Sequence, residues 1–174
     1  MSSGFVIWLT GLPASGKSTI ATLLAKKLSE MGVDVEVLES DVMRKVLTPR
    51  PTYSEEERDH FYNALVYIAF LLARHRVNVI LDATANKRKY RENARRKIDR
   101  FLEVYVRCPL EVCMKRDPKG LYKKALKGEI KTLPGLQVPY EEPLNPDLTI
   151  DTDKMSPEEC VHKILNLLRE LSWI

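Results

Sequence analysis

The chain has 174 residues, of which 44% are hydrophobic and 30% are charged, and it carries a net charge of +4 with an isoelectric point near 8.9. This length predicts one domain spanning residues 1–174. No stretch reaches the about 18 consecutive apolar residues of a membrane span, and no signal segment is evident. We therefore predict a cytoplasmic protein without a membrane span. Cys108, Cys113 and Cys160 show no paired spacing, which argues against zinc or a disulfide framework and predicts reduced, mostly buried thiols.

A phosphate-binding loop is the clearest motif in the chain. Residues 11–18 read Gly-Leu-Pro-Ala-Ser-Gly-Lys-Ser, which fits the pattern of a glycine, four free positions, Gly-Lys and then Ser or Thr. Apolar residues 5–10 predict a buried strand before the loop, and apolar side chains at helical spacing over residues 20–28 predict a helix after it. A chance glycine-rich turn is the alternative, and the two flanks argue against it. The predicted nucleotide-binding residues are Gly11, Ala14, Ser15, Gly16, Lys17, Ser18 and Thr19.

The loop residues have separate expected tasks. The glycines let backbone N–H groups point at phosphate oxygens beside the positive end of the helix dipole. Lys17 would reach the β- and γ-phosphates of ATP, so we expect a catalytic role for it. The Ser18 hydroxyl would bind Mg²⁺.

Two later strands are predicted to end near carboxylates. Residues 33–38 alternate apolar and polar side chains and lead to Asp41 and Arg44, while the apolar residues 77–81 lead to Asp82. Ligands of α/β sheets bind outside the carboxyl ends of the strands. Asp41 can there orient an acceptor hydroxyl, take its proton or help hold magnesium, with an exposed turn aspartate as the alternative. Asp82 looks like a Walker B acid that binds Mg²⁺ through water or Ser18, with loop capping as the alternative.

The remaining elements predict helices on both faces of the sheet. Ser54 with Glu57 three residues later predicts a capping box at the start of a long helix. Residues 87–100 predict a basic helix with eight Lys or Arg, which is either a solvated face or a surface for RNA. Further strands at 102–106 and 148–151 complete the alternation. We therefore predict an α/β fold of the P-loop NTPase type, with a parallel β-sheet flanked by helices on both faces.

A cationic segment interrupts this alternation at residues 116–142. Lysines recur between glycines and prolines, as in Asp-Pro-Lys-Gly at 117–120 and Pro-Gly at 134–135. Such a segment suits a mobile lid that closes over phosphates and excludes water. A solvated loop fits the composition alone equally well.

The same segment carries a resemblance to a known family. Residues 116–125 read Arg-Asp-Pro-Lys-Gly-Leu-Tyr-Lys-Lys-Ala, followed by Gly-Glu-Ile-Lys at 128–131 and Pro-Tyr-Glu at 139–141. With the phosphate loop, these motifs resemble the adenylylsulfate kinase (APS kinase) family of P-loop kinases, over most of the chain. The family transfers the γ-phosphate of ATP to the 3′-hydroxyl of adenosine 5′-phosphosulfate (APS), which yields 3′-phosphoadenylyl sulfate in sulfate assimilation. The resemblance implies ATP and Mg²⁺ as cofactors, a homodimer, and no nucleic-acid or membrane partner.

The resemblance also implies roles for single residues. Asp41 matches the catalytic aspartate of the family at the end of the second strand. The other roles concern the two ends of the site. Arg44 and Arg58 would hold the substrate, Tyr53 would stack on its adenine, Arg116 would lie against the ATP base, and Lys123 and Lys124 would lie near the phosphates.

The acceptor end departs from the family pattern. Where the family reads roughly Glu-Asn-Ile-Arg-Arg, residues 60–64 read His-Phe-Tyr-Asn-Ala, so an asparagine that binds substrate and a pair of arginines are missing. Ile-Ser-Pro-Tyr-Arg of the family becomes Ala-Thr-Ala-Asn-Lys at 83–87. The second aromatic residue of the adenine site is also replaced. The altered positions include Phe61, Asn63, Ala64 and Leu133.

These observations predict an adenylylsulfate kinase, with alternatives in which the acceptor differs. The first alternative is a P-loop kinase for another small hydroxyl compound or for an RNA end, because residues 79–84 also look like a segment of polynucleotide and aminoacyl-tRNA kinases. The second is a regulatory protein that binds ATP without turnover. Lys87, Arg88 and Arg91 are candidates to replace the missing acceptor contacts.

Overall fold

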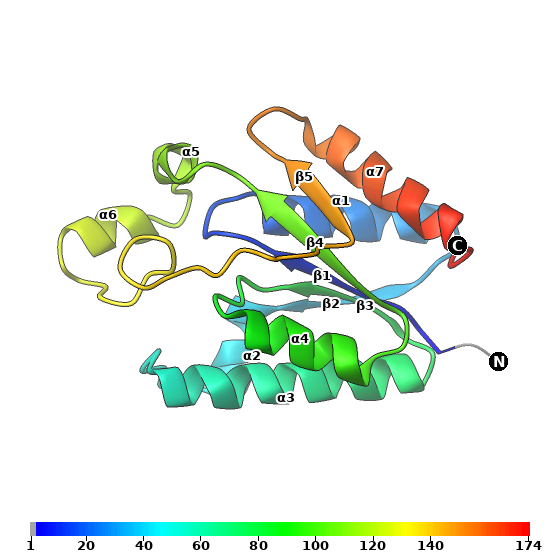
Figure 1. The fold of residues 1–174 in the computed structure, drawn as a ribbon, viewed down its shortest axis with the longest axis horizontal. Coiled ribbons are helices and arrows are strands. Elements are labelled where there is room, and N and C mark those ends of the chain that lie inside the picture. The colour runs from blue at the N-terminus through cyan, green and yellow to red at the C-terminus, as the bar shows by residue number, and fades with distance from the viewer. Residues whose placement is uncertain (1–2) are drawn as a thin grey trace.

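The computed structural model describes residues 3–174, and its centre is a parallel five-stranded sheet with the order β2-β3-β1-β4-β5 (Figure 1). Every neighbouring pair of strands runs parallel. The predicted parallel α/β sheet is therefore confirmed. Its strands are β1 (Val6–Thr10), β2 (Val35–Glu39), β3 (Asn78–Asp82), β4 (Phe101–Arg107) and β5 (Leu148–Asp151).

Helices cover both faces of this sheet (Figure 1). Helices α1 and α7 lie on one face, and α2, α3 and α4 lie on the other. Helices α5 and α6 project beyond the carboxyl ends of the strands together with the irregular chain that follows them. The bounds are α1 (Lys17–Glu30), α2 (Ser40–Leu47), α3 (Glu55–Arg74), α4 (Arg88–Lys97), α5 (Leu110–Arg116), α6 (Leu121–Leu126) and α7 (Pro157–Glu170).

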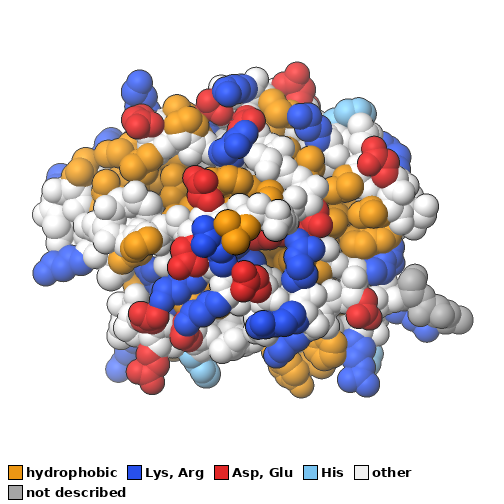
Figure 2. Space-filling model, viewed as in Figure 1, with side chains coloured by type: hydrophobic (Ala, Val, Ile, Leu, Met, Phe, Trp, Pro, Cys, Tyr) orange, Lys and Arg blue, Asp and Glu red, His pale blue; other side chains and the backbone are white. Residues whose placement is uncertain are grey.

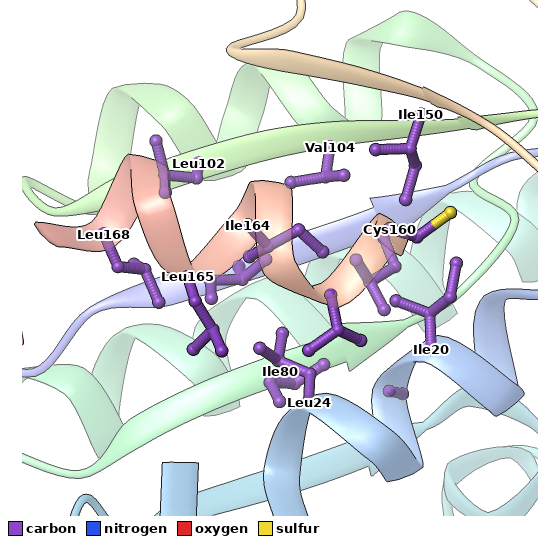
Figure 3. Packing of buried hydrophobic residues seen from close by; sticks show 14 of the residues in the cluster. Ile20, Leu24, Ile80, Leu102, Val104, Ile150, Cys160, Ile164, Leu165 and Leu168 are labelled. Carbon is purple, nitrogen blue, oxygen red and sulfur yellow. The ribbon is translucent and has the colours of Figure 1, made fainter. Parts of the chain in front are cut away.

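The first strand contributes to two hydrophobic cores at once, because successive side chains of a strand point to opposite faces. Phe5, Ile7 and Leu9 pack into a cluster with α1 and α7, which Figure 3 shows from close by. Val6 and Trp8 pack into a second cluster with α3 and α4. Burial on both faces explains why this strand is an unbroken apolar run rather than an alternating one.

The register of the sheet brings the predicted site residues to one edge. Leu9 of β1 lies opposite Asp82 of β3, and Glu39 of β2 lies opposite the same aspartate. The phosphate loop follows β1 directly, and Asp41 follows β2 within the first turn of α2. Strand order thus juxtaposes groups that are about 65 residues apart in sequence, from Lys17 to Asp82.

The predicted capping box at the start of α3 forms in only one of its two halves. The Ser54 hydroxyl accepts a hydrogen bond from the Glu57 backbone N–H at 3.2 Å. The Glu57 carboxylate does not return to Ser54 but accepts from the backbone N–H groups of Thr52 and Tyr53 at 2.6 and 3.1 Å. The carboxylate therefore holds the loop before the helix, and a complete capping box occurs instead at Ser156 of α7.

Helix α4 is shorter than the predicted basic helix, and several of its cations are paired. Lys89 donates to Asp59 of α3 at 2.6 Å, and Arg95 donates to Asp147 at 2.5 Å. Arg91 is buried and forms an ion pair with Glu103 of β4 at 2.7 Å. Figure 2 shows positive and negative side chains interleaved on the face that includes this helix. Several cations of this basic helix thus form ion pairs with neighbouring elements and are not simply solvated.

The three cysteines are free and buried, as predicted. Cys108 and Cys113 belong to a small third cluster, which they form with Tyr122, Ala125 and Leu133 of segment 116–142. Across residues 3–174, no helix combines the length and apolar character needed to span a membrane.

We predict that Leu24→Ala lowers the free energy of unfolding by about 2–5 kcal/mol, because Leu24 is fully buried between the sheet and α7 and its truncation leaves a cavity. Denaturant unfolding followed by circular dichroism measures this. The matched control is Leu126→Ala on α6, where the side chain is 67% exposed and we expect a change within about 0.5 kcal/mol. Equal losses in the two variants would contradict the described core.

Candidate active site

A cleft of about 1180 Å³ lies at the carboxyl edge of the sheet. It extends from the phosphate loop past the starts of α2 and α3 to the lid segment. Most of the residues predicted from sequence line it, so nucleotide, metal and acceptor candidates share one space. The predicted residues that line the cleft are Ala14, Gly16, Lys17, Ser18, Thr19, Asp41, Arg44, Tyr53, Arg58, Asp82 and Arg116.

The phosphate loop adopts backbone conformations that glycine tolerates. Gly16 has φ of 104° immediately before α1 and is left-handed, and Ala14 also has positive φ at 62°. A Cβ at Gly11 would lie 2.3 Å from the Val106 carbonyl oxygen, so no larger residue fits there. The loop therefore curls tightly at the N-terminus of α1, which is the arrangement that directs N–H groups toward phosphate.

Lys17 folds back onto the loop itself. Its Nζ donates to the carbonyl oxygens of Gly11 and Leu12 at 3.0 and 2.8 Å. Burial lowers the pKa of the Lys17 ammonium to about 8, because the charged form loses hydration that the nearby Asp82 only partly replaces. This buried cation faces a space that suits a polyphosphate, whose negative charges would stabilise it.

Two oxygen groups meet beside Lys17. Ser18 Oγ donates to Asp82 Oδ2 at 2.6 Å, and Asp82 is only 4% exposed. Mg²⁺ binds through hard oxygen ligands and completes its shell with phosphates and water, and this pair fits that chemistry. Among residues 3–174, no group of three or more His, Cys, Asp and Glu side chains could hold a metal ion.

The nucleotide end of the cleft is closed by a contact that the sequence patterns did not reveal. Thr152 Oγ1 donates to the Ser15 carbonyl oxygen at 2.6 Å. Arg116 Nη2 donates to the Thr152 carbonyl oxygen at 2.6 Å, which places its guanidinium next to the phosphate loop. The Ser15 hydroxyl is buried and has no hydrogen-bond partner within the described part of the chain. Thr152 follows β5 and belongs to no motif, so only the fold identifies it.

Segment 116–142, the predicted lid, brings cations into the cleft at positions other than those expected. Lys119 Nζ donates to Asp41 Oδ2, and this carboxylate raises the pKa of Lys119. Lys131 also lines the cleft. Lys123 and Lys124 are exposed on α6 and do not line it. Their contact with phosphates stays a prediction that requires movement of the lid.

The acceptor end contains a group of aromatic rings around a buried arginine. Arg44 is 8% exposed, and its Cζ lies 4.0 Å from the centre of the Phe61 ring and 4.8 Å from that of Tyr53. Glu57 Oε1 lies 3.4 Å from Arg44 Nη1. Arg58 donates to the Thr132 carbonyl oxygen of the lid at 2.6 Å. Both arginines predicted to hold the substrate are thus fixed at one end of the cleft.

The basic residues proposed as substitutes for missing acceptor contacts do not line the cleft. Lys87 pairs with Glu55 of α3, and Arg88 donates to the Glu142 carbonyl oxygen. Arg91 is 1% exposed and forms an ion pair with Glu103. The hypothesis that these three side chains replace acceptor contacts is wrong for this structure, since each is engaged elsewhere.

Comparison with known proteins decides the family. A family model described as adenylylsulphate kinase matches residues 3–151. The chain belongs to the adenylylsulfate kinase family. A probable adenylyl-sulfate kinase of Archaeoglobus fulgidus is 52% identical over 150 residues, which cover 86% of this chain and 97% of the relative. A probable adenylyl-sulfate kinase of Pyrococcus abyssi is 46% identical over 171 residues, covering 98% of each chain.

A solved adenylylsulfate kinase shares the whole fold. The APS kinase of Mycobacterium tuberculosis, determined in complex with AMPPNP and APS, matches with a TM-score of 0.91 at 36% identity, covering 97% of this chain and 99% of that one. The predicted P-loop kinase fold and family are confirmed. The altered residues at 61, 63, 64 and 133 therefore occur within an adenylylsulfate kinase and not in an unrelated phosphate-loop protein.

We predict that nucleotide affinity falls as pH rises through the pKa of Lys17. The ammonium binds phosphate and its neutral amine does not, so above about pH 8 the affinity for AMPPNP should fall by up to about tenfold per pH unit. Isothermal titration between pH 7 and 9.5 measures this.

Lys17→Arg is the matched control, because a guanidinium stays charged over that range. Its affinity at pH 7 is expected to be lower, but its pH dependence should largely disappear. A wild-type affinity that is constant from pH 7 to 9.5 would show that Lys17 is not a phosphate ligand with a lowered pKa.

Proposed function

We propose that this chain is an adenylylsulfate kinase that transfers the γ-phosphate of ATP to the 3′-hydroxyl of APS. The observation that carries the proposal is the single cleft in which a phosphate loop, Asp41 and Arg44 lie together. Family membership supports the ATP chemistry and the hydroxyl acceptor. The acceptor is argued from the likeness to the APS kinase solved with APS and AMPPNP.

The residues at the nucleotide end would bind and neutralise phosphate. Lys17 would turn from the carbonyl oxygens of its own loop to the β- and γ-phosphates, where it stabilises charge that develops during transfer. Ser18 would bind Mg²⁺, with Asp82 holding it directly or through water. When bound, Mg²⁺ neutralises phosphate charge and helps to orient the transferring group.

Asp41 is the group placed to act on the acceptor. It is the second residue of α2 and lines the cleft just after β2, whereas the phosphate loop follows β1, with β3 between the two strands. A carboxylate there can align the 3′-hydroxyl for in-line attack and accept its proton. Its ion pair with Lys119 would have to open, which would free a lid cation to meet the phosphates.

The alternatives have less support from the structure. An RNA end as acceptor would draw on the basic helix α4, yet Lys89, Arg91 and Arg95 are paired with carboxylates. A protein that only binds ATP has no need for a carboxylate such as Asp41 facing the acceptor end. We infer that another small hydroxyl compound is the alternative that the altered acceptor residues favour most.

Other parts of the proposal rest on the length and composition of the chain and, for the homodimer, on the family resemblance. We propose that residues 1–174 act as one kinase domain, that residues 116–142 act as a mobile lid, and that the protein is a cytoplasmic homodimer. The irregular chain around α6, part of which lines the cleft, supports the second of these. Sedimentation with and without nucleotide would test the homodimer.

The central experiment measures ADP release with Mg-ATP, with and without APS, and identifies the product by mass. We expect release to depend on APS and the product to carry a phosphate on the 3′-hydroxyl. ADP release that APS does not stimulate would overturn the proposed acceptor and direct the search to other hydroxyl compounds.

We predict that Asp41→Asn lowers turnover by about 10²–10⁴-fold, because it removes a proton acceptor while keeping the side-chain shape. AMPPNP affinity should change by less than about threefold, because the phosphate loop is untouched. The matched control is Asp34→Asn. Asp34 is exposed and directly precedes the first residue of β2, at the end of the strand away from Asp41, so turnover should stay within about twofold. Near-normal turnover of Asp41→Asn would rule out its catalytic role.

A further inference from the structure

We propose that Phe61 is a positioning residue that holds the Arg44 guanidinium in place to bind an anionic group of the acceptor. The Arg44 Cζ lies 4.0 Å from the centre of the Phe61 ring, closer than to any other ring it contacts. Phe61 is fully buried, so its ring cannot swing out into the cleft to touch a ligand itself. This inference rests on the proposed function, in which Arg44 binds substrate.

The long helix α3 supplies two of the groups that fix Arg44. Glu57 and Phe61 are four residues apart, so they lie on the same face of the helix, one turn apart. The Glu57 carboxylate contacts Nη1, and the Phe61 ring lies against the guanidinium carbon. A planar cation that contacts a carboxylate and an aromatic ring at once has little rotational freedom, and this pre-organisation favours binding.

The loop before α3 adds a third group. Tyr53 brings its ring to 4.8 Å from the Arg44 Cζ, and its backbone N–H donates to Glu57 Oε1. The same carboxylate therefore holds both the loop and the arginine. Tyr53 is 41% exposed and lines the cleft, so it can meet a ligand while Phe61 supports the arginine from within the core.

This geometry explains how the acceptor end can work without the family asparagine at this position. A phenylalanine has no hydrogen-bonding group, so it cannot replace an amide that contacts substrate. An aromatic face instead attracts a cation without neutralising it. The ring therefore orients Arg44 without adding to the partial neutralisation by Glu57, and the better-placed guanidinium offsets the loss of one direct contact.

The alternative is that Phe61 is only a core residue. It packs edge-on against Tyr62 with ring centres 5.2 Å apart and belongs to the cluster between the sheet and α3. A substitution will therefore also change stability, and a loss of activity alone would not separate the two roles. The separating measurement is whether the effect of Phe61 on APS requires Arg44.

The experiment is a double-mutant cycle read by steady-state kinetics. Phe61→Leu and Phe61→Met are made in the wild-type chain and in Arg44→Gln, and KM is measured for APS and for Mg-ATP. Met has about the same volume as Leu, but its unbranched, flexible side chain can fill the space left by the ring differently, so that a folded protein is available if the Leu variant unfolds. Phe70→Leu is the matched control, the same change about two and a half turns further along α3 and outside the cleft.

We predict that both Phe61 variants raise KM for APS by roughly 3- to 30-fold in the wild-type background, the range that a cation–π contact supplies. KM for Mg-ATP should stay within about twofold, because the nucleotide end is unchanged. In the Arg44→Gln background the same changes should alter KM for APS by less than about twofold, since the partner is gone. Phe70→Leu should leave both values unchanged in either background.

Two results would overturn the inference while leaving the proposed function intact. One is an APS-dependent wild-type enzyme in which the Phe61 variants leave KM for APS unchanged. The other is an equal increase of that KM in both backgrounds, which would mean that Phe61 acts on the core and not through Arg44. A wild-type chain without APS-dependent turnover would instead overturn the proposed function, and the inference with it.

Discussion

The pairing of β1 with β3 is the constraint on which the site depends. Because Leu9 lies opposite Asp82, the loop that leaves β1 meets the carboxylate that ends β3. The 2.6 Å hydrogen bond from Ser18 to Asp82 follows from that register. A shift of one residue would turn every side chain of β3 to the opposite face and remove the aspartate from the loop. The buried apolar side chains of both strands prevent such a shift, so the cores hold the catalytic geometry in place.

The buried Lys17 ammonium lacks a fully charged hydrogen-bond partner among the described residues that form this cleft. Its ammonium is held by carbonyl oxygens, which are dipoles rather than full charges, and burial lowers its pKa. A cation in that state gains more from a polyphosphate than an exposed lysine does, because it has already lost its hydration. The loop thus pays the cost of desolvation during folding and not during binding.

The fold and the nucleotide end could be predicted from sequence because each depends on local patterns. The phosphate loop is one contiguous motif, and β5 was predicted at the residues it occupies, 148–151. The contacts made by Glu57 and Thr152 could not be predicted in this way. The backbone N–H of Ser54 was an equally good local partner for the Glu57 carboxylate. Only the positions of Arg44 and of the loop before α3 explain why the carboxylate contacts those groups instead. Thr152 acquires its role because β5 ends beside the phosphate loop, which is a property of strand order.

The contacts of the buried arginine of α4 also could not be predicted from local sequence patterns. This arginine connects segment 116–142 to the strand that leads to the phosphate loop. In the sequence Arg91 is one of eight cations in a run, yet it forms the buried ion pair with Glu103 and donates to the Glu141 carbonyl oxygen, near the end of segment 116–142. Thr10 Oγ1 donates to the Thr84 carbonyl oxygen and lies 2.9 Å from the Tyr140 hydroxyl, so the tyrosine is the donor to Thr10. The end of segment 116–142 is therefore tied to the residue before Gly11. Breaking a buried pair of this kind costs several kcal/mol because the remaining charge stays unpaired, so these contacts fix residues 140 and 141, and any movement of segment 116–142 would take place before them.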